Sequence, residues 1–296
     1  MISEIQSDIE KIEADTSIYE HANFNARANA IDFIDFHILD RIDEITLHKE
    51  DELLELRKYA QSIKDKLEHI DEEMFQQLEQ QIKISKDKGL AFRSIIDKYV
   101  DSFQYVEEPL DTTGYDNLDI LINGLISNKS LSQPKRELEP EMVFYQKTPA
   151  RVVLELSKKV KRDDVFFDIG SGLGQVVILV HLMSSATAVG IEFEPSYCSY
   201  AKDLAIQYDL SSIEFLNEDA RMADYSTGTI FFLYTPFIGQ MMQDVLALLQ
   251  KVSRKKIIRI FTYGPCSATI AEQNWLNCIS GNPYKINKLY EFISLP

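Results

Sequence analysis

The sequence is poor in cysteine and lacks long apolar runs. Its three cysteines, Cys198, Cys266 and Cys278, are an odd, scattered set without a CxxC pair, which argues against a disulfide framework and against a zinc site. No stretch reaches the roughly 18 uninterrupted apolar residues of a membrane span. The first segment, MISEIQSDIEKIEAD, is acidic, whereas a signal peptide is basic and then apolar. These absences predict a cytoplasmic protein without a membrane anchor or a bound metal.

Positive charge is scarce in the first part of the chain. Residues 1–130 contain 14 Lys and Arg against 29 Asp and Glu, a net charge of −15, whereas residues 131–296 contain 17 against 18. A surface this acidic repels phosphate backbones, which disfavours nucleic acid as a partner and favours a basic protein or a small molecule. The acidity also fits a role in solubility alone.

Proline is missing before Pro109, so long helices are allowed in this acidic part. Apolar residues recur at helical spacing over residues 2–12 and 63–82. Gly89 is expected to end one helix, and Asp116 is expected to cap another over residues 117–126. We therefore predict an all-α accessory domain over residues 1–130, which gates the substrate entrance or forms a homodimer through its helices.

A charged connector with two prolines, LSQPKRELEPEM at residues 131–142, precedes a different pattern. Short β-rich runs alternate with helical stretches at residues 165–169, 187–192, 213–217, 229–234 and 256–263, and two closing runs follow, YKINKL and YEFISL. Apolar strands separated by helices predict a Rossmann-like α/β domain over residues 131–296, with a parallel sheet covered by helices on both faces. Ligands of such sheets lie beyond the carboxyl ends of the strands.

The first of these strands ends in an acid and a glycine loop. Asp168 is followed by Gly170, Gly172 and Gly174, and the third glycine comes one residue too early for a dinucleotide-binding GxGxxG loop. A carboxylate beside the loop would repel a pyrophosphate, but it would attract a cofactor that carries an ammonium and a sulfonium and no phosphate. The pattern predicts S-adenosylmethionine as the cofactor and resembles the first motif of class I methyltransferases.

Two further acids end the next two strands. Glu192 can accept hydrogen bonds from both ribose hydroxyls, while Asp219 can accept the adenine amino group and Ala220 can donate its backbone N–H to the ring. Each acid alone also fits a surface or turn residue, so the prediction depends on the ordered set. Glu194 and Glu218, which lie beside them in the sequence, are expected to be solvated.

The residues before the first strand carry a more specific resemblance. Thr148 is expected to cap a helix that begins at Pro149, which makes FYQK, residues 144–147, a loop over the methionine end of the cofactor. A Y-x-x-T loop followed by D-x-G-S-G-x-G-Q-V-V and G-x-E resembles the disruptor-of-telomeric-silencing family of non-SET lysine methyltransferases over roughly residues 140–235. The resemblance implies a methyltransferase in which S-adenosylmethionine contacts Tyr145, Thr148, Asp168, Gly170, Gln175, Glu192 and Asp219.

The fourth strand departs from that family, which has a paired asparagine and a phenylalanine where this chain has LYTPF. Tyr234 offers a hydroxyl and Phe237 a ring face, so an aliphatic amine or a hydroxyl is as suitable an acceptor as an amide. We predict that Tyr145, Tyr234 and Phe237 line the acceptor channel as the catalytic residues, with a protein lysine or a small molecule as substrate. Two alternatives stay open: a helical interaction protein that binds S-adenosylmethionine without catalysis, and a nucleotide-cofactor oxidoreductase.

Overall fold

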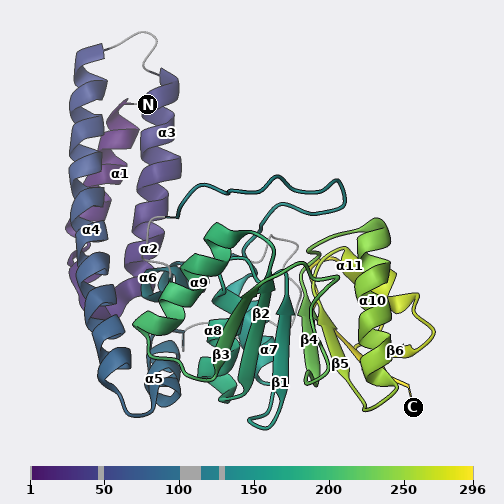
Figure 1. The fold of residues 1–296 in the computed structure, drawn as a ribbon. Coiled ribbons are helices and arrows are strands. Elements are labelled where there is room, and N and C mark those ends of the chain that lie inside the picture. Colours follow the sequence, from purple (N-terminus) through teal and green to yellow (C-terminus); the bar gives the residue numbers. More distant parts are fainter. Residues whose placement is uncertain (1, 46–49, 101–114, 127–130, 296) are drawn as a thin grey trace. The chain divides into compact units, whose positions relative to one another are not determined.

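The computed structural model describes residues 2–45, 50–100, 115–126 and 131–295. They form two compact units, one helical and one α/β (Figure 1). The helical unit comprises the described residues within 1–81, 95–103 and 116–127, and the α/β unit comprises those within 82–94, 104–115 and 128–296. The domain boundary at residue 130 stays a prediction, and the structure groups residues 82–94 with the α/β unit.

The helical unit is built from long amphipathic helices. They are α1 (Ile2–Ala14), α2 (Phe24–Phe33), α3 (Asp40–Ile45), most of α4 (Glu50–Ile84), the end of α5 (Lys88–Val100) and α6 (Asn117–Ile126). A π-helical turn, Ile34–Leu39, joins α2 to α3. The apolar faces of α1, α3, α4 and the π-helical turn meet in one core, which includes Ile5, Ile9, Ile38, Ile63 and Leu67, as the spacing predicts. No helix in the described part of the chain combines the length and the apolar character that a membrane span requires.

The ends of these helices match the sequence prediction at one position and differ at another. Asp116 caps α6, because its Oδ1 accepts the backbone N–H of Leu118 at 2.8 Å, as predicted. Gly89 does not end a helix: α4 ends at Ile84, and Gly89 lies in the first turn of α5. Asp87 caps that turn by accepting the N–H of Leu90 at 2.8 Å, so an acid rather than the glycine marks this boundary.

The α/β unit contains a seven-stranded sheet in the order β3-β2-β1-β4-β5-β7-β6. The parallel strands are β1 (Val165–Ile169), β2 (Thr187–Glu192), β3 (Ile213–Asn217), β4 (Ile230–Leu233) and β5 (Arg259–Thr262). The edge differs from the prediction, because β7 (Tyr290–Ser294) is antiparallel to β5 and pairs with β6 (Leu276–Cys278). YKINKL forms turns instead of a strand. The three residues of β6 are too few to produce an alternating pattern.

Helices cover both faces of this sheet, which confirms the Rossmann-like class. α8 (Gln175–Ser184) and α9 (Pro195–Gln207) form the crossovers from β1 to β2 and from β2 to β3, and α7 (Ala150–Ser157) packs on α8. On the opposite face, α10 (Gly239–Ser253) and α11 (Cys266–Ala271) share one apolar cluster with the strands. Representative members are Phe167, Ile191, Leu233, Met241 and Leu249. Because β1 to β4 are parallel, their carboxyl ends lie together at one end of the sheet.

Candidate cofactor-binding and active site

A cavity lies at the carboxyl ends of β1 to β4. All the site residues predicted from the sequence line it, except Gly172 and Gly174. The lining members of that set are Tyr145, Thr148, Asp168, Gly170, Gln175, Glu192, Asp219, Ala220, Tyr234 and Phe237. The described lining contains no Lys, Arg or His. The structure thus brings the predicted residues together, and their individual roles stay predictions.

The glycine loop connects β1 to α8 and forms one wall of the cavity. Backbone N–H groups of Gly170 and Ser171 both donate to the carbonyl of Ile191 at 2.9 Å, which fixes the loop to β2. Gly172 has a φ of +52° and lies directly against the ring of Tyr145. A side chain at this position would be strained and would also collide with that ring. The glycine therefore allows Tyr145 to cover the loop.

Asp168 is buried in the cavity wall, with a relative exposure of 3%. None of the described basic side chains forms an ion pair with it. Burial, together with the nearby negative charge of Glu192, raises the pKa of Asp168 to about 8. A cation in the cavity would offset this desolvation cost by stabilising the ionised carboxylate. The position is therefore suited to a positively charged ligand.

Glu192 has its carboxylate fixed by the backbone. Its Oε2 accepts the N–H of Gly172 and its Oε1 accepts the N–H of Glu194, both at 2.7 Å. Burial raises the pKa of Glu192, while these hydrogen bonds act in the opposite direction. The carboxylate is thus held in one orientation at the end of β2, where the sequence predicts the ribose contact.

Two other polar side chains of this wall lack partners. Gln175 Oε1 and Nε2 and Ser171 Oγ are buried and form no hydrogen bond among the described residues. Buried polar groups are normally paired, and both residues line the cavity. A polar ligand in the cavity would satisfy them.

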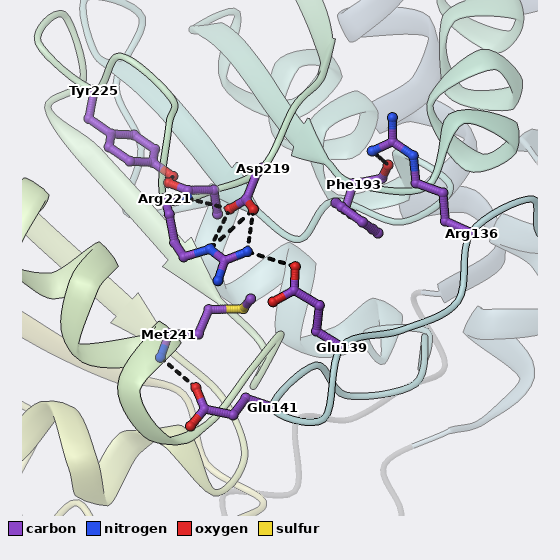
Figure 2. A network of polar contacts seen from close by, with 9 residues as sticks. Arg136, Glu139, Glu141, Phe193, Asp219, Arg221, Tyr225 and Met241 are labelled. Carbon is purple, nitrogen blue, oxygen red and sulfur yellow. Dashed lines mark hydrogen bonds and ion pairs between the residues drawn. The ribbon is translucent and has the colours of Figure 1, made fainter.

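Asp219 follows β3 and is bound to Arg221, a residue that the sequence analysis did not identify. Arg221 Nε lies 3.0 and 3.1 Å from the two Asp219 oxygens, and Nη2 lies 2.5 Å from Oδ2. Arg221 Nη2 also donates to Glu139 Oε1 at 2.8 Å (Figure 2). The Arg221 hydrogen bonds lower the pKa of Asp219. The turn is fixed further by Tyr225, whose hydroxyl donates to the carbonyl of Ala220 at 2.8 Å.

Residues 135–143, hereafter the strap, cross the carboxyl ends of β2, β3 and β4. Glu141 accepts the N–H of Met241 at 2.7 Å, in the first turn of α10 (Figure 2). It also accepts the N–H of Gln240 at 3.0 Å. Val143 N–H donates to the carbonyl of Pro236 at 3.1 Å. The strap is therefore part of the cavity wall, although its sequence reads as a connector.

Glu194 holds the beginning of the strap, which corrects the expectation that it is solvated. It is 4% exposed, and its carboxylate accepts the N–H groups of Lys135 and Arg136 at 2.9 and 2.8 Å. It also caps α9 by accepting Ser196 N–H at 2.9 Å. Burial alone would raise the pKa of Glu194, but the hydrogen bonds from Ser196 and from the strap lower it to about 2.

Glu194→Gln is expected to loosen the strap. The amide keeps the shape of the side chain but loses the charge that strengthens these hydrogen bonds, so trypsin should cleave after Lys135 and Arg136 about three to ten times faster, as for a loss of about 1 kcal/mol. Because the folded-state pKa lies below the unfolded one, the stabilisation is present above about pH 4.5 and is lost as the pH falls toward 2. Glu214→Gln, an exposed position of β3, is the control. Equal cleavage rates in both variants would contradict this role.

Thr148 lies one residue further from its helix than predicted. α7 begins at Ala150, and Pro149 is its N-cap with an extended ψ of 133°. The Pro149 carbonyl accepts the N–H groups of Val152 and Val153 at 3.0 and 3.2 Å. No side chain caps this helix. Thr148 is instead buried in the cavity wall.

Aromatic side chains line two parts of the cavity: Tyr145 lies against the glycine loop and the first turn of α9, whereas Tyr234 directly follows β4. The Tyr145 ring packs against Tyr197 at 5.5 Å between centroids, and the Tyr234 ring packs against Tyr263 at 5.1 Å. Burial raises the pKa of both Tyr145 and Tyr234, so their hydroxyls stay protonated at neutral pH. Phe237 is 4% exposed and packs mainly in the α10 cluster. It therefore presents only part of its ring to the cavity.

Part of the chain matches known proteins. Residues 144–213 match the family model described as "Histone methylation protein DOT1". An RNA methyltransferase from Salinibacter ruber in complex with S-adenosyl-L-homocysteine is 24% identical, over 51% of this chain and 97% of that chain, with a TM-score of 0.38. Precorrin-6y C5,15-methyltransferase from Geobacter metallireducens GS-15 is 16% identical, over 49% and 86%, with a TM-score of 0.36. Magnesium protoporphyrin IX methyltransferase from Synechocystis PCC 6803 with bound S-adenosylmethionine is 13% identical, over 49% and 77%, with a TM-score of 0.39.

The class of the α/β unit follows from the family match together with the sheet and the cavity. It is a class I S-adenosylmethionine-dependent methyltransferase domain that resembles the DOT1 family over the matched segment. The cavity lining suits S-adenosylmethionine, the cofactor that the sequence predicts. Among the described residues, Asp168 has no cationic partner there, and the side-chain amide of Gln175 has no hydrogen-bond partner and could bind a ligand.

Proposed function

We propose that this methyltransferase transfers the methyl group to an amine or a hydroxyl, either of a protein lysine or of a small molecule. The observation that carries the proposal is the charge of the cavity. Asp168, Glu192 and Asp219 line it, and the described lining has no basic side chain. Such a cavity favours a cationic or neutral acceptor over an anionic one.

The residues of the chain bind, orient and dehydrate the reactants. When bound, S-adenosylmethionine supplies a methyl group on a positively charged sulfur. Methyl transfer depends mainly on alignment and on exclusion of water. The acceptor atom itself attacks the methyl carbon, so the protein need not supply a nucleophile. An ammonium acceptor must first lose its proton, and an aromatic environment favours that loss by lowering the amine pKa. Tyr145, Tyr234 and Phe237 provide such surroundings.

A partner of basic or neutral character fits the acidity of residues 1–130 better than nucleic acid does. We include in the proposal a cytoplasmic location and a helical unit that gates the substrate or forms a homodimer. Measurement of the molar mass in solution tests the homodimer directly.

A second candidate is an S-adenosylmethionine-binding interaction protein without catalysis. The departure at LYTPF favours it, because this chain lacks the asparagines of the resembling family at that position. Incubation with methyl-labelled S-adenosylmethionine and fractionated cell extract distinguishes the two. Label in a protein or metabolite fraction, absent with Asp168→Asn, supports the enzyme; saturable binding without transfer to any fraction supports the second candidate.

Tyr234→Phe is expected to lower kcat about tenfold, the effect of losing one hydrogen bond of about 1.4 kcal/mol to the acceptor. The affinity for S-adenosylhomocysteine should stay within twofold, because the acids that bind the cofactor are unchanged. Tyr284→Phe, a tyrosine that is 69% exposed, is the matched control. An unchanged kcat for Tyr234→Phe would remove this hydroxyl from the acceptor site.

A further inference from the structure

The strap is held by different kinds of contact at its two ends and in its middle. At its beginning, backbone N–H groups of Lys135 and Arg136 bind the buried carboxylate of Glu194. Near its end, Glu141 accepts two backbone N–H groups of α10. In the middle, the ion pair that the structure describes between the strap and the rest of the unit joins Glu139 to Arg221, whose side chains are 43% and 31% exposed.

Arg221 binds two carboxylates at once. Its Nε and Nη2 donate hydrogen bonds to the Asp219 carboxylate, and the same Nη2 donates to Glu139 (Figure 2). The planar guanidinium has a fixed arrangement of donors, which fixes the direction of a bound carboxylate. Asp219 Oδ1 also accepts the backbone N–H of Arg221 at 2.8 Å. A carboxylate has about four acceptor positions, so these three donors, the backbone N–H, Nε and Nη2, leave about one position of Asp219 for a ligand.

Asp219 and Leu138, the residue before Glu139, both line the cavity. The guanidinium therefore joins the end of β3 to the part of the strap that lies against the cavity. Neither Asp219 nor the middle of the strap has another basic partner among the described residues.

We propose that Arg221 is a positioning residue for S-adenosylmethionine: it orients the Asp219 carboxylate toward the adenine and ties the strap across that part of the cavity through Glu139. This inference rests on cofactor binding as part of the proposed function. Because water screens these partly exposed pairs, the effect is expected in ligand affinity, whereas folding should change little.

The test is calorimetric titration with S-adenosylhomocysteine. Arg221→Ala should weaken binding about tenfold, because both the orientation of Asp219 and the strap contact are lost. Glu139→Gln should weaken binding about threefold, because only the strap contact is affected. The affinity of Arg221→Lys should lie between those of Arg221→Ala and wild type. In methylation assays the KM for S-adenosylmethionine should rise in parallel while kcat changes less than twofold. Arg254→Ala, an exposed arginine at the end of α10, is the control.

The outcomes separate this inference from the proposed function. If the wild-type protein does not bind S-adenosylhomocysteine, the proposed function fails. If the wild-type protein binds and Arg221→Ala binds within twofold of it, the assignment of Arg221 is overturned and the proposed function stands. If circular dichroism shows that Arg221→Ala is unfolded, Arg221→Lys and Glu139→Gln are used instead. If both bind S-adenosylhomocysteine within twofold of wild type, the assignment of Arg221 is overturned.

Discussion

Asp168→Asn is expected to weaken the binding of S-adenosylmethionine about 30- to 1,000-fold, which corresponds to about 2–4 kcal/mol. The amide has nearly the shape of the carboxyl group but cannot carry the negative charge. Asp168 is buried, and no described basic side chain pairs with it, so the ligand is the only cation in the described cavity that would compensate that charge. The substitution therefore removes the main electrostatic contribution to binding.

The same substitution is expected to change the pH dependence of binding. With a pKa of about 8, Asp168 is mostly protonated in the free protein at pH 6, and a cationic ligand must displace that proton. Affinity should therefore increase by up to tenfold per pH unit between pH 6 and about 7.5, below the ordinary pKa of an α-amino group. Asp168→Asn should remove most of this slope. Glu192, whose pKa burial also raises, would leave a smaller residual slope.

The stability of the ligand-free protein should decrease as the pH rises, whereas its affinity for the ligand increases. The folded-state pKa of Asp168 lies above that of an unfolded aspartate, so its contribution is fully present below about pH 4 and is lost as the pH rises through about 8. Asp168→Asn should consequently unfold at a higher temperature than wild type at pH 8, and the difference should shrink toward pH 5.

Calorimetry between pH 6 and 7.5 and thermal unfolding between pH 5 and 8 measure both effects. Asp163→Asn, an exposed residue just before the opposite end of β1, is the control and should match wild type. An affinity of Asp168→Asn within threefold of wild type would show that the cofactor does not lie against this carboxyl group.

The parts of the site that the sequence predicted are those encoded by local patterns. Apolar runs identified β1 to β5 because buried parallel strands are continuously hydrophobic, and each of the predicted acids stands at or just beyond a strand end. Their proximity in the fold then follows from strand order, since parallel strands bring their carboxyl ends to one edge.

The parts that the sequence missed depend on contacts between distant residues. Glu194 reads as a surface acid, yet its partners in the strap lie 59 and 58 residues earlier. Arg221 has its second partner 82 residues away, and no spacing rule connects them. The i, i+2 pair of Asp219 and Arg221 was the only local signal available. Similarly, β6 has three residues and is defined by its pairing with β7 rather than by its own pattern.

Arg27 is a further residue that local patterns do not identify, because it is a fully buried arginine in a helix of the acidic unit. Its Nε donates to Asp71 Oδ1 at 2.7 Å, which joins α2 to α4. Its Nη1 donates to the carbonyls of Ile18 and Glu20 at 3.2 and 2.8 Å. A buried ion pair adds little stability over apolar residues of the same size, whereas removal of one partner leaves the other charge uncompensated.

Arg27→Met is therefore expected to lower the free energy of unfolding of the helical unit by about 3–5 kcal/mol. Arg27→Met/Asp71→Leu should recover part of this loss, because it also removes the uncompensated carboxylate, although the two carbonyls stay without their donor. Arg41→Met, at a partly exposed arginine 3.5 Å from Asp8, should cost about 1 kcal/mol or less. Hydrogen exchange of the α4 amides measures the helical unit, while the fluorescence of the single tryptophan, Trp275, reports on the α/β unit. If Arg27→Met and Arg41→Met lower protection of α4 equally, the Arg27–Asp71 pair does not stabilise this unit.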